Sequence, residues 1–230
     1  AGGDSMGQDF GAEWAPGVRP AIFPPHSGAR VGGPPGEGGF QSLRLQTHYD
    51  NKRGTGLYDS SGINIYRTES LRTHDLGGFQ IGDGASNILW ATLGTIPEGL
   101  SRYDFYCPPL ATAHLSAPID VVTMQLHMHI TGTRMQMRTF NSSGKEKTLP
   151  LTTEYYDFNY QDYKQEASYD LNNMRLIVQI HPGDSFYTSC WFDNRNAPEG
   201  RKVGNLATHK WGIGSDDEMC TVFGNYLLTS

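Results

Sequence analysis

Short strand-like segments separated by turn residues recur along this chain from Phe40 onwards. They are rich in β-branched and aromatic residues or alternate apolar with polar ones, and Gly, Pro, Asn, Asp and Ser cluster between them. This spacing is typical of an all-β sandwich, and no stretch has the periodicity of a long amphipathic helix. The segments expected to form strands are 43–49, 63–66, 88–93, 102–107, 121–130, 134–140, 174–180, 185–192 and 219–228.

Turn-forming residues indicate how the chain is organised. Its 28 glycines and 13 prolines favour turns over helices, and they are frequent in residues 1–40. We expect irregular loop there, with one short strand near 21–23. His181–Asp184 is predicted to form a tight turn, and the polar stretch 68–74 suggests a domain boundary near residue 70.

Charge, hydropathy and motif content exclude several functional classes. A formal net charge of −6 argues against a nucleic-acid binder that relies on electrostatics. No apolar run reaches the roughly 18 residues that a transmembrane helix needs, so no transmembrane segment is expected. A Gly-x-Ser-x-Gly match at Gly3–Gly7 lies in the irregular start of the chain and not on the strand-to-helix turn that a nucleophile elbow needs. No phosphate-binding Gly-x-x-x-x-Gly-Lys loop occurs, so serine hydrolases and nucleotide-binding enzymes gain no support.

The cysteines and one sequon favour an oxidising compartment. Cys107, Cys190 and Cys220 are too few for a disulfide-dense miniprotein but are compatible with one disulfide and a leftover thiol. Asn141-Ser142-Ser143 is an N-glycosylation sequon, a signal that is weak by itself. Together they favour a secreted protein or one in the lumen of the secretory pathway.

Residues 121–130 form the clearest predicted strand and carry the first candidate metal ligands. Alternation along a strand places His127 and His129 on the same face, where two imidazoles can bind one metal ion. The alternative is two polar residues on a solvated face, which a bare His-x-His motif favours. No carboxylate lies within 121–130, so a soft or borderline metal fits better than calcium or magnesium.

Met219 follows an acidic turn and is the second candidate. In a strand Met219 and Cys220 face opposite sides, so a disulfide from Cys220 can fix the backbone while the Met219 thioether points elsewhere. Most methionines are packing residues, but a thioether beside two imidazoles suits copper that cycles through Cu(I). His48 is a third candidate, although a lone histidine in a strand is more often structural.

Other polar and aromatic residues are interpreted as core, structural or surface residues. A cluster of tyrosines and Phe158 within 155–169 could stack against a sugar, but core packing is the default. The remaining histidines lie in loop-like contexts and are interpreted as structural or surface residues: His26, His74, His114, His181 and His209.

Five motifs in the same order resemble the copper type II, ascorbate-dependent monooxygenases, a family of peptide-amidating and amine-hydroxylating enzymes. The resemblance covers nearly the whole chain, and the ordered set is far more specific than any single motif. The motifs are Glu13–Gly17, Gly32–Gly36, the His-Tyr segment Leu45–Tyr49 followed by Asp59–Gly62, the His-x-His strand Gln125–Gly132, and the Glu-Met-Cys element Asp217–Cys220.

The resemblance implies two jelly-roll-like β domains, each holding one copper, that face each other across a water-filled cleft. Residues 1–70 would then be the C-terminal part of the first domain, and residues 71–230 the whole of the second. His127, His129 and Met219 would bind the copper that activates dioxygen. His48 would be one of three histidines on the other copper, which stores electrons.

The same resemblance assigns the cysteines. Cys190 and Cys220 would form the disulfide beside the methionine. The usual partner of Cys107 would lie a little beyond residue 230.

Two departures from the family pattern matter. The adjacent His-His pair that completes the electron-storing site does not occur in these 230 residues. We therefore expect that residue 1 falls inside the first domain, or that this relative has lost that copper. On the substrate side, Gln125 stands where the peptide-amidating enzymes have arginine, and Thr221 and Phe223 also differ, which disfavours a peptide-glycine substrate.

The family resemblance implies a copper-dependent monooxygenase that hydroxylates a C–H bond of a small, amine-like substrate, with dioxygen as oxidant and ascorbate as reductant. The alternative is a non-catalytic extracellular glycoprotein that keeps the fold for assembly with other chains. The missing His-His pair and the altered Thr221 and Phe223 motivate that alternative. Sugar binding through the tyrosine cluster is a third, weaker hypothesis.

Overall fold

Almost all regular structure in the described part of the chain is β-strand. The computed structural model describes residues 14–20, 22–33, 39–42, 45, 47, 49, 54–83, 94–147, 150–161, 169–170, 175–176, 178–196, 208–214 and 217–227. Within these ranges there is no α-helix, and no helix is long and apolar enough to cross a membrane. Short 3₁₀ turns occur at η2 (Pro109–Ala111) and η3 (Asn194–Asn196).

The strands match the sequence pattern closely in the second half of the chain. Of the predicted segments, 102–107, 121–130, 134–140, 185–192 and 219–228 each lie within two residues of a strand at both ends. The strands are β1 (Ser27–Gly28), β2 (His74–Gly82), β3 (Thr95–Pro97), β4 (Leu100–Cys107), β5 (Ile119–Met128), β6 (Gly132–Phe140), β7 (Leu151–Thr153), β8 (Tyr169–Asp170), β9 (Arg175–Leu176), β10 (Val178–Ile180), β11 (Ser185–Asp193), β12 (Thr208–Lys210) and β13 (Cys220–Leu227).

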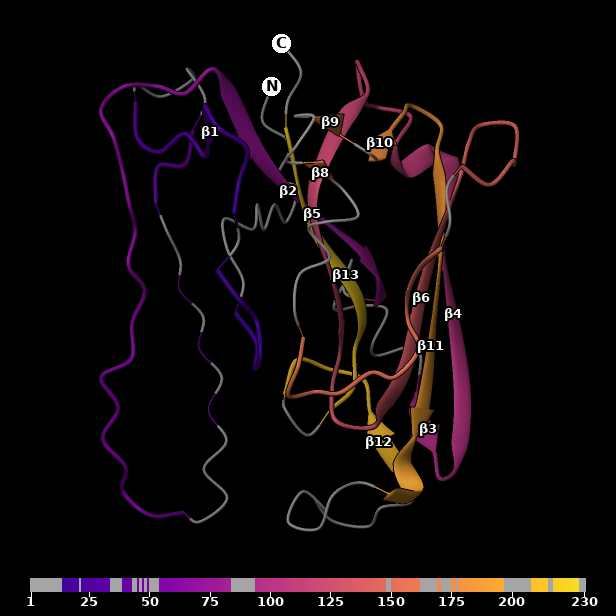
Figure 1. Ribbon diagram of the computed structural model, residues 1–230. Coiled ribbons are helices and arrows are strands. Elements are labelled where there is room, and N and C mark those ends of the chain that lie inside the picture. Colours follow the sequence, from indigo (N-terminus) through magenta and orange to yellow (C-terminus); the bar gives the residue numbers. More distant parts are fainter. Residues whose placement is uncertain are drawn as a thin grey trace.

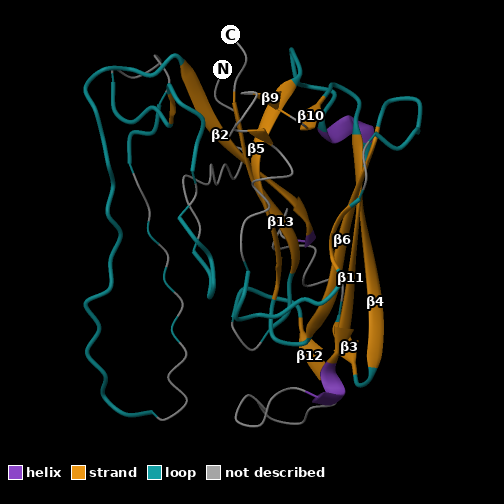
Figure 2. Ribbon diagram, in the orientation of Figure 1, coloured by secondary structure: helices purple, strands orange, loops and turns teal. Residues whose placement is uncertain are grey.

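Two sheets pack face to face, which confirms the predicted all-β sandwich (Figure 1). One sheet has five strands in the order β1-β2-β13-β5-β10, and the other has four in the order β4-β11-β6-β7. Figure 2 shows that loops connect the strands at both ends of the sandwich. Two further pairs, β3 with β12 and β8 with β9, are separate two-stranded ladders.

The hydrophobic core lies between the two sheets. Met128 and Val222 from the five-stranded sheet meet Met135 and Phe192 from the four-stranded sheet, and all four are fully buried. Trp211 closes one end of this core, where its ring lies edge-on to those of Tyr103, Phe105 and Phe192 at centroid distances of 5.0, 5.6 and 5.6 Å. Such pairs add about 0.5–1.5 kcal/mol each beyond the burial of area.

A disulfide joins the two sheets through the core. Cys190 of β11 and Cys220 of β13 are bonded, with their Cα atoms 5.9 Å apart, as the family resemblance implied. The bond fixes the first residue of β13 and therefore the chain just before it. Cys107, at the end of β4, is not disulfide-bonded, and burial raises the pKa of its thiol.

The glycine-rich strand β2 was not predicted. From the sequence alone, Gly77 and Gly82 indicate a turn. In the structure both glycines pair with β13, where atoms of that strand leave no room for a Cβ. A Cβ at Gly77 would overlap the ring of Tyr226, and a Cβ at Gly224 of β13 would overlap the ring of Phe79. Each aromatic ring therefore covers a glycine on the neighbouring strand, a packing that local propensity does not reveal.

Several predictions for the first part of the chain were wrong or lie outside the described residues. Residues 63–66 form no strand; they belong to the exposed, extended stretch 54–73, which Figure 1 shows in purple away from the sandwich. Nor does the part of 21–23 that is described form a strand. Segment 88–93 and much of 43–49 lie outside the described residues.

Two histidines assigned to loops lie in strands instead. His74 is the first residue of β2, and His209 is the middle residue of β12. The predicted turn at His181–Asp184 is confirmed, because the Asp184 amide donates to the His181 carbonyl at 3.0 Å.

The close approach of β2 to β13 predicts unequal effects of two glycine substitutions. Gly82 and Gly99 have similar positive φ angles, +116° and +105°, so alanine is strained at either position and should cost about 1–2 kcal/mol. A Cβ at Gly82 would also overlap the carbonyl of Cys220, whereas a Cβ at Gly99 would meet no atom within 4 Å. We expect urea unfolding to show a further loss of about 1–3 kcal/mol for Gly82→Ala. Equal losses would contradict this packing.

Candidate metal centre

His127 of β5 and His129, one residue beyond the end of β5, lie on the face that points away from the sandwich core. Leu126 and Met128, which alternate with them, belong to the core cluster on the other face. The predicted placement of both imidazoles on one face is therefore observed. This face is not solvated, since His127 is 9% exposed and His129 is 5% exposed.

The pairing of β5 with β13 brings Met219 to the same face. The strands are antiparallel, with Met128 opposite Cys220 and His127 opposite Thr221. Continued one residue beyond β13, this register places Met219 beside His129. Met219 is buried at 7% exposure.

The ring of His127 is fixed by a side-chain hydrogen bond. Its Nδ1 lies 2.6 Å from Oε1 of Gln161, and its ring centroid is 5.6 Å from that of Phe223. With a carbonyl oxygen beside it, Nδ1 carries the proton. The lone pair then resides on Nε2, the nitrogen that a metal ion can use.

The ring of His129 is fixed in the same way by the main chain. Its Nδ1 lies 2.8 Å from the carbonyl oxygen of Asp217, which can only accept a hydrogen bond. The ring centroids of His127 and His129 are 5.0 Å apart, and Phe158 lies edge-on to His129 at 6.2 Å. In the neutral form, both imidazoles are thus held as Nδ1–H tautomers, whose lone pair is on Nε2.

Glu218 anchors the chain immediately before Met219. Its carboxylate is fully buried and accepts hydrogen bonds from the backbone amides of His129 and Thr131, at 3.1 and 2.7 Å, and from the Thr131 hydroxyl at 2.7 Å. Burial raises the pKa of Glu218 to about 7, and the hydrogen bonds it accepts oppose that rise. These hydrogen bonds hold Glu218, and with it the backbone just before Met219, against the residues that follow β5.

The available ligands fit copper. Two neutral imidazole nitrogens and a thioether are the donors that Cu(I) favours, whereas calcium and magnesium require oxygen ligands. In the part of the chain that the structure describes, no group of three or more His, Cys, Asp and Glu side chains is placed to hold an ion. Among the described residues on this face, the sulfur of Met219 is the third donor beside the two imidazoles.

The three residues predicted on the substrate side share the face of His127. Thr221 is opposite His127, and Phe223 is opposite Gln125. The hydroxyl of Thr221 donates to buried Asp83 at 2.5 Å. Gln125 is fully buried, and its Nε2 donates to the carbonyl of Gln161 at 2.8 Å. Its Oε1 has no hydrogen-bond partner among the residues that the structure describes.

Sequence reasoning missed the residues that support these ligands. Gln161 and Phe158 approach the histidines from a loop more than 25 positions along the chain, and no periodic pattern marks them. Tyr156, in the same loop, donates to the carbonyl of Met128 and holds the end of β5. Tyr156 and Phe158 lay within the aromatic cluster at 155–169, which was interpreted as core packing, and Glu218 lay within the Glu-Met-Cys element.

The sequence also named two other candidate residues. His48 is outside the described residues, so its place relative to His127 is not defined. Asn141 lies on an exposed turn after β6, where its Oδ1 accepts hydrogen bonds from the amide and hydroxyl of Ser143 at 3.1 and 2.8 Å.

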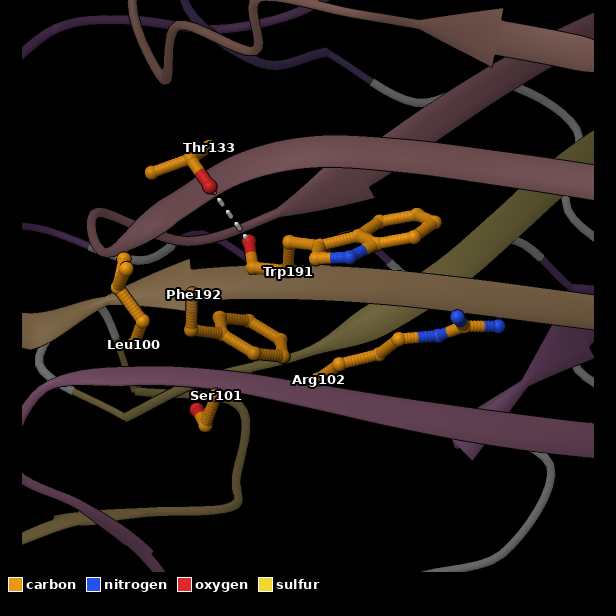
Figure 3. Close-up of a pocket in the computed structure, with 6 residues that line it drawn as sticks. All are labelled: Leu100, Ser101, Arg102, Thr133, Trp191 and Phe192. Atoms are coloured by element: carbon orange, nitrogen blue, oxygen red, sulfur yellow. Dashed lines mark hydrogen bonds between the residues drawn. The ribbon is translucent and has the colours of Figure 1, made fainter.

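A pocket of about 280 Å³ lies on the outer face of the other sheet, away from the histidines (Figure 3). Trp191 lines it, with the guanidinium of Arg102 4.9 Å from the ring and that of Arg134 4.4 Å from it. The pocket holds no candidate metal ligand: its lining consists of Leu100, Ser101, Arg102, Thr133, Trp191 and Phe192.

Known proteins resemble this chain along most of its length. It is 29% identical over 220 residues to dopamine beta-hydroxylase of Equus caballus and 29% identical over 225 residues to DBH-like monooxygenase protein 1 of Mus musculus, covering 94% of this chain and 32% of each relative. Tyramine beta-hydroxylase of Caenorhabditis briggsae is 26% identical over 223 residues, with 95% of this chain and 34% of that protein covered. The chain thus spans about a third of the length of these relatives.

Residues 87–229 match the family described as copper type II ascorbate-dependent monooxygenase, C-terminal domain. That range contains the sandwich from β3 to β13, including the two histidines and Met219. The chain therefore belongs to the copper type II ascorbate-dependent monooxygenase family.

Proposed function

We propose that this chain is part of a copper monooxygenase that hydroxylates a C–H bond of a small, amine-like substrate with dioxygen and ascorbate. One observation carries the proposal: His127 and His129 share a buried face, and the ring of each is held by a hydrogen-bond acceptor at Nδ1. Met219 supplies a thioether on that face.

In this proposal His127, His129 and Met219 are the metal ligands and the catalytic residues. Bound copper would supply the redox chemistry by which one oxygen atom enters the substrate and the other leaves as water, with two electrons from ascorbate. The chain itself would hold three neutral donors at buried positions. A neutral, sulfur-containing ligand set favours the reduced ion, which keeps the site reducible by ascorbate.

Gln125 supports a substrate that carries hydrogen-bond donors. Its Oε1 is a buried acceptor that no described residue hydrogen-bonds, on the face that also bears His127. An ammonium or phenol group can donate to such an oxygen, whereas a carboxylate cannot. Among the described residues no Lys or Arg is buried, so this face offers a carboxylate no buried counterion. Relatives named for dopamine and tyramine agree with an amine-like substrate.

Residues 1–70 fit the end of a preceding domain that holds a second copper, with His48 among its ligands. The extended stretch 54–73 exposes Leu57, Tyr58 and Tyr66, which are 71%, 106% and 94% exposed, and such side chains usually pack against protein.

Copper stoichiometry separates this proposal from a non-catalytic assembly protein. Two coppers per full-length chain support catalysis, and one or none supports the structural alternative.

A secretory location accords with the cysteines and the sequon. The disulfide Cys190–Cys220 persists in an oxidising compartment, and Asn141 is accessible on its turn. We propose that Asn141 carries a glycan and that the protein is secreted or resides in the lumen of the secretory pathway.

Removal of the thioether should abolish hydroxylation while the fold remains. Met219→Ile keeps an apolar side chain of similar volume, so we expect cooperative unfolding like that of the wild type. Activity on tyramine with ascorbate should fall by more than about 100-fold, beyond the 10- to 100-fold typical for residues that only support a metal ligand. X-ray absorption of the Cu(I)-loaded full-length protein should lose its copper–sulfur contribution.

Met137→Ile provides the matched control for this substitution. Met137 is also a buried methionine, at 4% exposure, but it lies in the core of the other sheet. We expect wild-type copper–sulfur scattering and activity from this variant. Undiminished hydroxylation by Met219→Ile would refute the assigned role.

Glycosylation of the sequon predicts a mobility shift that depends on Ser143. Expressed through a eukaryotic secretory pathway, the protein should lose one glycan on PNGase F treatment. Ser143→Ala removes the sequon and should eliminate that shift, whereas Ser143→Thr preserves the sequon and should retain it. An unchanged shift in Ser143→Ala would place the glycan elsewhere.

A further inference from the structure

Gln161 is buried to 2% exposure on the face of the two histidines, and its side-chain amide is held at both ends. Nε2 donates to the carbonyl oxygen of Phe158 at 2.8 Å, and Oε1 lies 2.6 Å from Nδ1 of His127. The Phe158 carbonyl can only accept, so the NH₂ group must face it. Oε1 must then face His127, and this arrangement requires the proton of His127 to be on Nδ1.

The main chain of Gln161 is fixed as well. Its amide donates to the Pro16 carbonyl at 3.0 Å, and its carbonyl accepts from Nε2 of Gln125 at 2.8 Å. Gly17 lies so close to this loop that an added Cβ would overlap the carbonyl of Asn159. Gln161 is therefore held by contacts from β5, from its own loop and from the segment around Pro16.

We infer that Gln161 is a positioning residue that keeps His127 in the Nδ1–H tautomer and directs its Nε2 lone pair toward the metal. This inference rests on the proposed function, because it takes His127 as a metal ligand. Hydrogen-bond acceptors at the second nitrogen of a ligating imidazole set both its tautomer and its ring orientation, and their removal typically lowers metal affinity by about 10- to 100-fold.

His129 offers an internal reference. Its Nδ1 proton goes to the backbone carbonyl of Asp217, which no side-chain substitution removes. A change at Gln161 should therefore alter the tautomer of His127 and leave that of His129 unaffected. A general loosening of the site would alter both.

The test is imidazole ¹⁵N NMR of the metal-free full-length protein labelled at histidine. We expect both rings to be Nδ1–H in the wild type. Gln161→Leu should convert His127 to a mixture with the Nε2–H form, and the Cu(I) dissociation constant should rise about 10- to 100-fold in competition with a Cu(I) chelator. Gln161→Glu retains an acceptor at this position and should keep the Nδ1–H tautomer.

Two controls separate positioning from general destabilisation. Gln136→Leu removes an amide that donates to Thr152 on the other sheet, and it should change neither readout. Gly17→Ala disturbs the loop without altering Gln161, and it should weaken Cu(I) binding in the same direction. Gly32→Ala, at a similar φ of +74° with no atom within 4 Å of its Cβ, should not. This remote pair keeps the test valid should Gln161→Leu fail to fold.

The inference is overturned if folded Gln161→Leu keeps His127 as Nδ1–H, or if its Cu(I) affinity stays within about threefold of wild type. It is also overturned if both histidines change together. A wild-type protein that binds no Cu(I) would overturn the proposed function instead, while the tautomer of metal-free His127 would still show whether Gln161 fixes the ring.

Discussion

The antiparallel pairing of β5 with β13 is the contact on which the rest of the structure depends. Its register sends Leu126, Met128, Cys220 and Val222 into the core between the sheets. The same register sends His127 and the residues around it to the opposite face. A slip of one residue would exchange the two sets, so the hydrophobic core and the proposed metal ligands are specified together. The disulfide between Cys190 and Cys220, whose Cα atoms are 5.9 Å apart, attaches β13 to the other sheet and so helps to hold that register.

The end of this strand pair is held by polar groups that are buried and satisfied. Glu218 accepts hydrogen bonds from His129 and Thr131, so the residue before Met219 is tied to the end of the histidine strand. On the other side of Met219, the disulfide at Cys220 fixes the backbone. The thioether is thus placed by its two neighbours in sequence. Ligands held in advance lose little freedom when a metal binds, which is what a site of only three protein donors requires.

The sequence pattern predicted the second half of the fold well and the first half poorly. Strands such as β5 and β11 alternate or carry apolar runs, and local chemistry suffices to identify them. β2 was missed because its Gly77 lies under the ring of Tyr226 and its Phe79 covers Gly224 of β13. These contacts belong to a pairing between residues more than 130 positions apart. Residues 63–66 have strand-like composition but no neighbouring strand in the described structure, and composition alone does not provide one.

The sequence by itself determined that His127 and His129 share a face, that Met219 and Cys220 point to opposite sides, and that the ordered motifs are those of a copper monooxygenase. These follow from the period of a β-strand and from short motifs, which are local properties. Only the tertiary structure decided which ring nitrogen each histidine presents, because the acceptors are Gln161 and the Asp217 carbonyl, brought in by separate loops. It also decided that this face is buried rather than solvated. Hydrogen-bond partners and burial depend on which distant segments pack together, and no periodicity in the chain encodes that packing.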